Sequence, residues 1–86
     1  MKKYVAVLMT ESEDTAAGIT DVLMFDTLED AKEYIKADSP EVEGRYDFNE
    51  TIKDYSDRPN EGKIVLEWQY YAWGLWSTWQ VKEFEV

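Results

Sequence analysis

Hydrophobic and polar positions follow two different periods along the chain. From Lys2 to Met9 they alternate, with several β-branched residues, which is typical of a strand with one buried side. A second apolar stretch, Ile19–Phe25, contains a run that is apolar on both faces, as in a central strand or one covered by helix and loop. We therefore expect strands at Lys2–Met9 and Ile19–Phe25. A polar loop over Thr10–Gly18 should join them, with Gly18 supplying a positive φ angle.

After Phe25 the spacing of apolar residues changes to three and four. The apolar positions are Leu28, Ala31, Tyr34 and Ile35, and the opposite side carries Glu29, Lys32, Glu33 and Lys36. This pattern predicts an amphipathic helix that begins near Leu28. Either Asp26 or Thr27 can cap its first turn, because an acidic residue follows each of them three positions later. The sequence Asp38-Ser39-Pro40 should end the helix, since proline disfavours a helical residue before it.

The segment from Asp38 to Gly62 is too long to be a plain loop in so small a domain. Phe48, Ile52 and Tyr55 have the spacing of a short second helix, but Tyr46 and Phe48 also fit an extended segment, and both alternatives stay open. Arg58-Pro59-Asn60-Glu61-Gly62 is typical of a turn.

Alternation returns in the last third of the chain, where Lys63–Trp73 and Leu75–Val86 should form a hairpin around Gly74. A two-residue turn places Trp68 opposite Trp79, whereas a four-residue loop places Tyr70 opposite Trp79. Both registers give the same two faces, because side chains repeat every two residues. The predicted core face holds Ile64, Leu66, Trp68, Tyr70, Ala72, Leu75, Trp79 and Val81. The predicted outer face holds Val65, Glu67, Gln69, Tyr71, Trp73, Trp76, Thr78, Gln80, Lys82 and Phe84.

All four tryptophans lie in this hairpin, which therefore has more aromatic surface than one sheet face easily buries. Trp68 and Trp79 are predicted core residues. Tyr71, Trp73 and Trp76 either form an exposed partner surface or are covered by the middle segment; exposed aromatic patches usually mark contacts with another molecule.

Together these elements predict a single α+β domain spanning residues 1–86. Its four-stranded, largely antiparallel sheet would pack against one helix in the order ββα(α)ββ. A β-grasp-like variant, in which the first and last strands are adjacent and parallel, has the same element order.

Composition restricts the chemistry. The chain has no His and no Cys, so the usual nucleophile and base pairs, thiolate metal sites and disulfides are absent. No catalytic residue, cofactor or metal is predicted, and we expect a protein that is not an enzyme. Glu11, Glu13 and Asp14 could surround a hard cation, but their spacing alone does not build a coordination shell, and a solvated acidic loop is the favoured explanation. No apolar stretch approaches the length of a membrane span, and we expect a cytoplasmic protein.

The formal net charge is −10 on 86 residues, and from Glu11 to Glu61 sixteen acidic residues face five basic ones. Such a field repels nucleic acids and anionic membranes and attracts basic surfaces. The leading hypothesis is a non-enzymatic module that docks on a basic protein. In one form of this hypothesis the partner is a nucleic-acid-binding enzyme, which the module inhibits as a charge mimic in the manner of phage anti-defence proteins. The alternatives are protein recognition or homodimerisation, and binding of a sugar or small ligand, through the aromatic face of the last hairpin. The candidate partner-binding residues are Tyr71, Trp73, Trp76, Glu11, Glu13 and Asp14.

Overall fold

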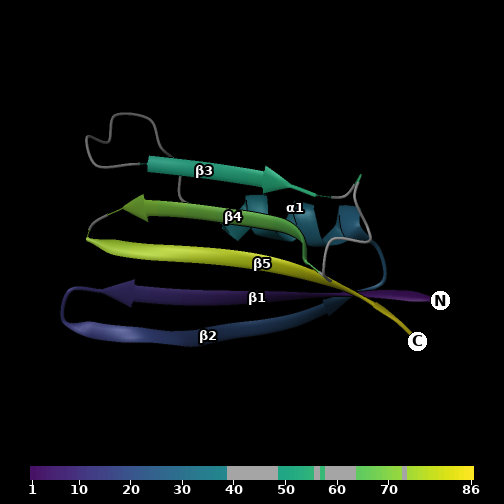
Figure 1. Ribbon diagram of the computed structural model, residues 1–86, viewed down its shortest axis with the longest axis horizontal. Coiled ribbons are helices and arrows are strands. Elements are labelled where there is room, and N and C mark those ends of the chain that lie inside the picture. The colour runs from purple at the N-terminus through teal and green to yellow at the C-terminus, as the bar shows by residue number, and fades with distance from the viewer. Residues whose placement is uncertain (39–48, 56, 58–63, 73) are drawn as a thin grey trace.

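The computed structural model describes residues 1–38, 49–55, 57, 64–72 and 74–86. These residues form an α+β fold in which one antiparallel sheet packs against one helix (Figure 1). The elements are β1 (Lys2–Ser12), β2 (Thr15–Phe25), α1 (Leu28–Asp38), β3 (Asn49–Asp54), β4 (Ile64–Ala72) and β5 (Leu75–Glu85). The five strands are arranged in the order β2-β1-β5-β4-β3.

The expected sheet had four strands, and this number is wrong. The additional strand is β3, which pairs antiparallel with β4 and places Ile52 opposite Trp68. The helical alternative for Ile52 therefore fails, because pairing along β4 stabilises the extended form that local spacing left undecided. Tyr46, Phe48 and the predicted turn at Arg58–Gly62 lie outside the described residues.

The first and last strands, β1 and β5, are adjacent, as in the β-grasp-like variant, but they run antiparallel to each other. Lys2 lies opposite Glu85 and Ser12 lies opposite Leu75. The parallel pairing that defines the variant is not found between these two strands. Because β1 also pairs antiparallel with β2, it occupies the interior of the sheet and contributes to the core along much of its length.

The predicted loop over Thr10–Gly18 is much shorter in the structure. β1 continues to Ser12 and β2 begins at Thr15, so only Glu13 and Asp14 form the turn. The hydroxyl oxygens of Thr10 and Thr20 are hydrogen-bonded across the two strands at 2.7 Å. Gly18 lies within β2, and among the described glycines only Gly74 has a positive φ angle, of 76°. Because β1 pairs with both β2 and β5, the hairpin of β1 and β2 continues through residues whose polarity alone predicted a loop.

The helix has the predicted boundaries. Thr27, rather than Asp26, is its N-cap: the backbone N–H of Asp30 donates to the Thr27 hydroxyl at 3.1 Å, and the N–H of Ala31 donates to the Thr27 carbonyl at 3.3 Å. The carboxylate of Asp26 instead accepts a hydrogen bond from the ammonium group of Lys3. This contact links the end of β2 to the beginning of β1.

The core lies between α1 and one face of the sheet, and α1 is behind the sheet in Figure 1. Its buried members are Ala6, Leu8, Ala31, Ile35, Val65, Leu66, Trp68, Tyr70, Trp79 and Val81. Trp68 lies opposite Trp79 and Leu66 opposite Val81, which confirms the register predicted for a hairpin whose connection has two residues between Ala72 and Leu75. The Tyr34 ring meets the edge of Trp79 with centroids 6.0 Å apart, and so joins helix to sheet.

Ile64, Val65 and Leu75 depart from the predicted arrangement of the hairpin. The register of β4 against β5 shifts between Ile64 and Leu66. Ile64, predicted on the core face, lies opposite the outer-face residue Lys82, and Leu66 lies opposite Val81, the next residue of β5 toward its start. The extra residue of this bulge, Val65, is buried beside Leu66, although alternation placed it on the outer face. Leu75, expected in the core, is 40% exposed because it lies directly after the turn.

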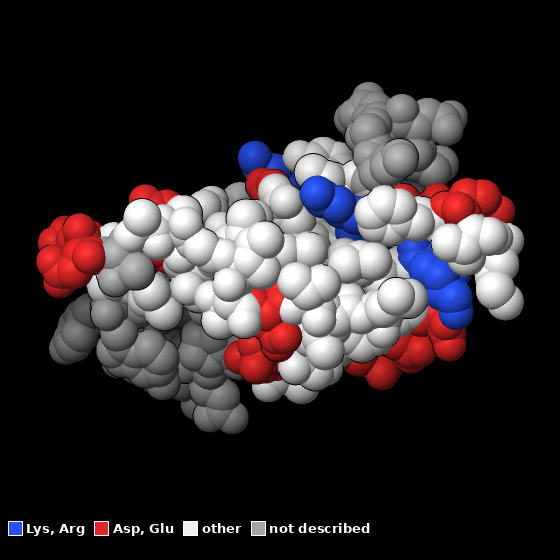
Figure 2. Space-filling view, turned by 90° about the horizontal axis from the view of Figure 1, so that it is seen from below, with Lys and Arg blue, Asp and Glu red and all other residues white. Residues whose placement is uncertain are grey.

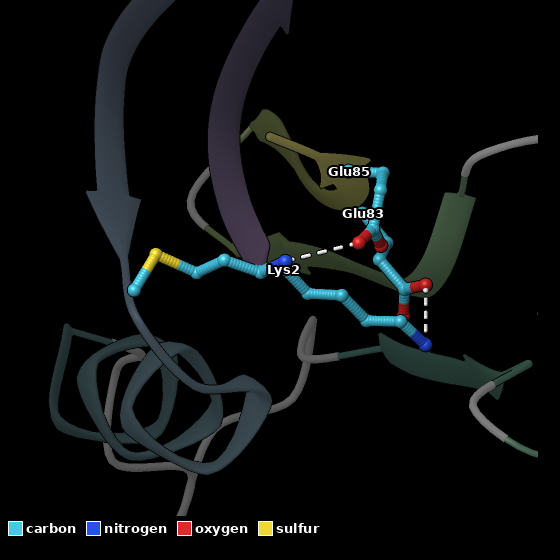
Figure 3. Close-up of polar contacts among 4 residues, drawn as sticks. Lys2, Glu83 and Glu85 are labelled. Carbon is cyan, nitrogen blue, oxygen red and sulfur yellow. Dashed lines mark hydrogen bonds and ion pairs between the residues drawn. The ribbon is translucent and has the colours of Figure 1, made fainter.

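Ion pairs hold the end of the sheet where β1 begins and β5 ends (Figure 3). The Lys2 ammonium lies 3.2 Å from a Glu83 carboxylate oxygen, and the Met1 amino group lies 3.0 Å from Glu85. The hydrogen bond and charge of Glu83 raise the pKa of Lys2. Burial, followed by the charge of Glu83, raises the pKa of Tyr4 on the same face. In the part of the chain described here, no helix is long and apolar enough to cross a membrane.

Candidate functional site

Both tight turns of the sheet lie at the same end of the molecule, on the left of Figure 1. This arrangement follows from the register of the central strands: Ser12 pairs with Thr15 on one side and with Leu75 on the other. The structure thereby brings together two groups of predicted site residues that are about sixty positions apart in the sequence. We call this region, formed by Glu11, Glu13, Asp14, Tyr71 and Trp76, the aromatic–acidic end.

The aromatic part is a pair of rings on adjacent strands. Tyr71 of β4 and Trp76 of β5 are direct cross-strand partners, with ring centroids 4.8 Å apart and planes inclined at 48°. They lie on the sheet face opposite α1, which we call the open face, because they alternate with the buried Tyr70 and Ser77. Trp76 is 40% exposed and Tyr71 is half-buried, so the pair is accessible from solvent. Trp73 lies outside the described residues.

The acidic part begins beside the Trp76 ring. Glu11 of β1 is the direct cross-strand partner of Trp76 and is exposed. Glu13 and Asp14 follow in the turn between β1 and β2, and both are exposed. A carboxylate thus lies next to an aromatic ring pair, and two more carboxylates lie farther out at the tip.

A shallow depression of about 370 Å³ opens on the open face at this end. Its lining residues are Met9, Thr10, Glu11, Ala17, Gln69, Trp76 and Thr78. The polar groups of Thr78 and Gln69 lie on paired residues of β5 and β4. Sequence alternation placed Gln69 and Thr78 on the outer face of the hairpin but did not relate them to Met9 or Ala17, because that relation depends on the pairing of β1 with β5 and β2.

Charged groups are not spread evenly over the surface. Figure 2 shows the side of the molecule formed by the β2 edge, where most of the described surface is uncharged. Carboxylates gather at the two ends, one of which is the end with the turn of β1 and β2, and a smaller group lies between them. On this side, uncharged surface separates the negative groups from one another.

A metal site receives no support from the described residues, among which no three Asp, Glu, His or Cys side chains lie close enough together to hold an ion. This applies to Glu11, Glu13 and Asp14, whose closeness in sequence does not make their carboxylates converge. What the aromatic–acidic end offers is ring faces and negative charge, which suit a cationic group held without coordination bonds.

Comparisons with protein-family models, with curated proteins and with solved structures found no match to this chain.

Proposed function

We propose that the protein is a non-enzymatic acidic module that docks on a basic surface of another protein and holds a cationic side chain of that partner at the aromatic–acidic end. The observation that supports this proposal is the position of Glu11 directly opposite Trp76, whose ring pairs with Tyr71 at 4.8 Å. Neither the rings nor the carboxylate alone would select a cation on a protein surface.

The chemistry favours arginine as the side chain that is held. A guanidinium group stacks on an aromatic face and donates two parallel hydrogen bonds to a carboxylate, and it is desolvated more easily than the ammonium group of lysine. At this end Trp76 supplies the face and Glu11 supplies the carboxylate. Glu13 and Asp14 would attract further basic residues around the contact, and the net charge of −10 would accelerate encounter at low salt.

Mimicry of a nucleic acid is one form of this proposal, in which the basic partner is a nucleic-acid-binding enzyme that the module inhibits. A mimic needs a continuous row of carboxylates at phosphate-like spacing. The side shown in Figure 2 has separated groups instead, which favours a local contact at one end.

A binding titration tests the proposal, with an arginine-rich peptide and a lysine-rich peptide of equal length as probes. At about 50 mM salt the wild type should bind the arginine peptide more tightly, and binding should weaken steeply at about 500 mM. Trp76→Ala should weaken it by about two- to fivefold, which corresponds to about 0.5–1 kcal/mol for an exposed cation–π contact. Glu11→Gln should weaken it beyond its matched control, Glu33→Gln, which removes the same charge from an exposed position on α1.

If Trp76→Ala and Glu11→Gln bind like Glu33→Gln, only the overall field attracts the peptide, and the assigned site is wrong. Absence of binding by the wild type at low salt would contradict the docking function itself.

The depression beside Trp76 favours a second candidate function, binding of a sugar or a small cationic headgroup. Its volume of about 370 Å³ lies within the usual range of ligand sites, and Gln69 and Thr78 supply polar groups on the same face as the indole. Tryptophan fluorescence should then respond to choline or to a simple sugar, and Trp76→Ala should abolish the response. A fluorescence signal that no member of such a panel changes contradicts this candidate.

A further inference from the structure

The open face carries an apolar patch on β1 and β2 that begins at the depression of the aromatic–acidic end, which Met9 also lines, and continues toward the opposite end. Three cross-strand pairs form it: Val5 with Met24, Val7 with Val22, and Met9 with Ile19. Their neighbours Ala6 and Leu8 are buried against α1, so by alternation these six side chains point to the opposite side of the sheet.

The patch is accessible to a partner. Ile19 and Met24 are each 68% exposed and Val22 is 55% exposed, while the three β1 residues are half-buried by their neighbours. No element of the described chain lies over this part of the sheet. A contiguous apolar surface of this kind is uncommon on a protein that acts alone.

The edge of β2 is a less suitable contact than the face. Thr20 has no register partner on β1, because Asp21 lies opposite Leu8 and Ile19 opposite Met9, and such a bulge bends an edge away from straight pairing. The Asp21 carboxylate also accepts a hydrogen bond from the backbone N–H of Val22 at 3.0 Å. A strand added to this edge would compete with that bond and approach a charge.

We propose that a second copy of this chain covers the patch, with the two open faces packed against each other and related by a two-fold axis that runs across the strands. This inference does not depend on the proposed function. Because such an interface runs the length of the strands, it would also cover Glu11 and Trp76, so the dimer and the docked module would be alternative states of the same face.

The area of the face is sufficient for a stable dimer. β1, β2 and β5 have 11 residues each. At about 4.8 Å between strands and about 3.3 Å per residue, these three strands cover a flat area of about 500 Å². Two copies would bury about 1,000 Å² or more, which is the lower bound for a specific interface.

The distribution of charge selects the orientation. With the axis across the strands, the pair Val7 and Val22 packs against the same pair of the second copy. Met9 and Ile19 then pack against Val5 and Met24 of the second copy. Glu11, at one end of β1, then faces the end that carries Lys3 and its ion-pair partner Asp26, so it does not meet Glu11 of the second copy. An axis parallel to the strands would instead place Glu11 of both copies at the same end.

The open face carries little net charge. Among the described residues it has Lys3, Lys53 and Lys82 against Glu11, Glu67 and Asp26, the last of which is ion-paired with Lys3. Glu67 is hydrogen-bonded to Gln80 at 3.1 Å and lies 4.0 Å from Lys53. Two copies with a formal charge of −10 each can therefore approach through this face with little local repulsion.

Sedimentation velocity over a range of concentrations tests the dimer. The wild type should be dimeric at about 100 µM and dissociate on dilution. The double variant Val22→Glu with Met24→Glu, at two exposed positions, should weaken association at least tenfold. Its matched control is Ala37→Glu, which adds a carboxylate on exposed α1 and should remain dimeric. Circular dichroism establishes that each variant is folded. A wild type that stays monomeric at about 1 mM, or a double variant as dimeric as the control, overturns the proposal.

Cross-linking tests the axis, since the chain has no cysteine and each introduced thiol is unique. Val7→Cys should be joined to itself by a short bismaleimide. Glu11→Cys should be joined efficiently only when mixed with Lys3→Cys. Efficient linking of Glu11→Cys to itself would overturn the orientation, and a dimer in which Val7→Cys does not react would indicate edge pairing instead.

Discussion

The two tryptophans Trp76 and Trp79 of β5 provide a direct test of the two-faced sheet. They are three residues apart, but Trp79 is fully buried against α1 and Trp76 is 40% exposed on the open face. Truncating a fully buried aromatic residue to alanine costs about 3–5 kcal/mol. At about 0.05–0.15 kcal/mol per residue, 86 residues have a total stability of about 4–13 kcal/mol. Trp79→Ala should therefore remove about a quarter or more of the free energy of unfolding.

The loss expected from Trp76→Ala is much smaller. Its aromatic contact is the Tyr71 ring, with the ring centroids 4.8 Å apart, and an aromatic pair of this kind contributes about 0.5–1.5 kcal/mol. We expect a cost of about 1 kcal/mol for this variant. Trp79→Phe should recover much of the loss seen with alanine, because the Trp79 indole N–H has no acceptor among the described residues and its removal leaves no partner unsatisfied.

Urea denaturation followed by far-UV circular dichroism measures all three variants without relying on tryptophan fluorescence. With an m value of about 1 kcal/mol/M, the midpoint should fall by about 1 M for Trp76→Ala and by about 3 M or more for Trp79→Ala. If the two alanine variants have midpoints within about 0.5 M of each other, the assignment of these side chains to opposite faces is refuted.

Three further predictions concern the helix cap, the hairpin turn and pH. Thr27→Ala should lower the free energy of unfolding by about 1 kcal/mol in thermal denaturation while Thr27→Ser changes it little, because only the hydroxyl bond to the Asp30 N–H is lost. Gly74→Ala should cost about 1–2 kcal/mol in the same assay owing to its φ of 76°, whereas Gly18→Ala, with no heavy atom within 4 Å of the added methyl group, should be close to neutral. Burial raises the pKa of Tyr70 above the ordinary value of 10.0, so the folded state holds this proton more tightly and stability should decrease as the pH rises above 10.0. Urea midpoints across that range check the effect, and Tyr70→Phe should reduce the slope; a slope unchanged by this substitution would contradict it.

The spacing of hydrophobic residues was sufficient to predict those elements in which one spacing dominates. The helix boundaries, the hairpin around Gly74 and the burial of Trp68 and Trp79 were all predicted correctly. In each of them the side chains that repeat at one period are also those that pack in the core, so periodicity and burial agree.

The predictions failed where a residue's conformation depends on a distant strand. Ile52 becomes part of β3 only because β4 is available beside it, and the residues after Met9 remain extended because β5 and β2 flank them. Val65 is buried because a one-residue bulge in β4 shifts the alternation of inward and outward side chains. Nothing in the residue types around Val65 indicates this bulge. Among the candidate site residues, Glu11 and Trp76 were selected for separate reasons, and nothing local indicated that they are neighbours.

The amino-acid sequence alone determined the acidity, the lack of nucleophile and base pairs, the helix, and the inward side of the last hairpin between Leu66 and Val81, because these depend on composition and on the repeat of side chains along one segment. Strand order, the joining of both turns at one end, and the gathering of Val5, Val7 and Met24 into one uncovered patch were decided only in three dimensions. The physical reason is that backbone hydrogen bonding between strands is almost independent of side-chain identity. Pairing is therefore selected by burial over the whole sheet rather than by any short stretch of residues.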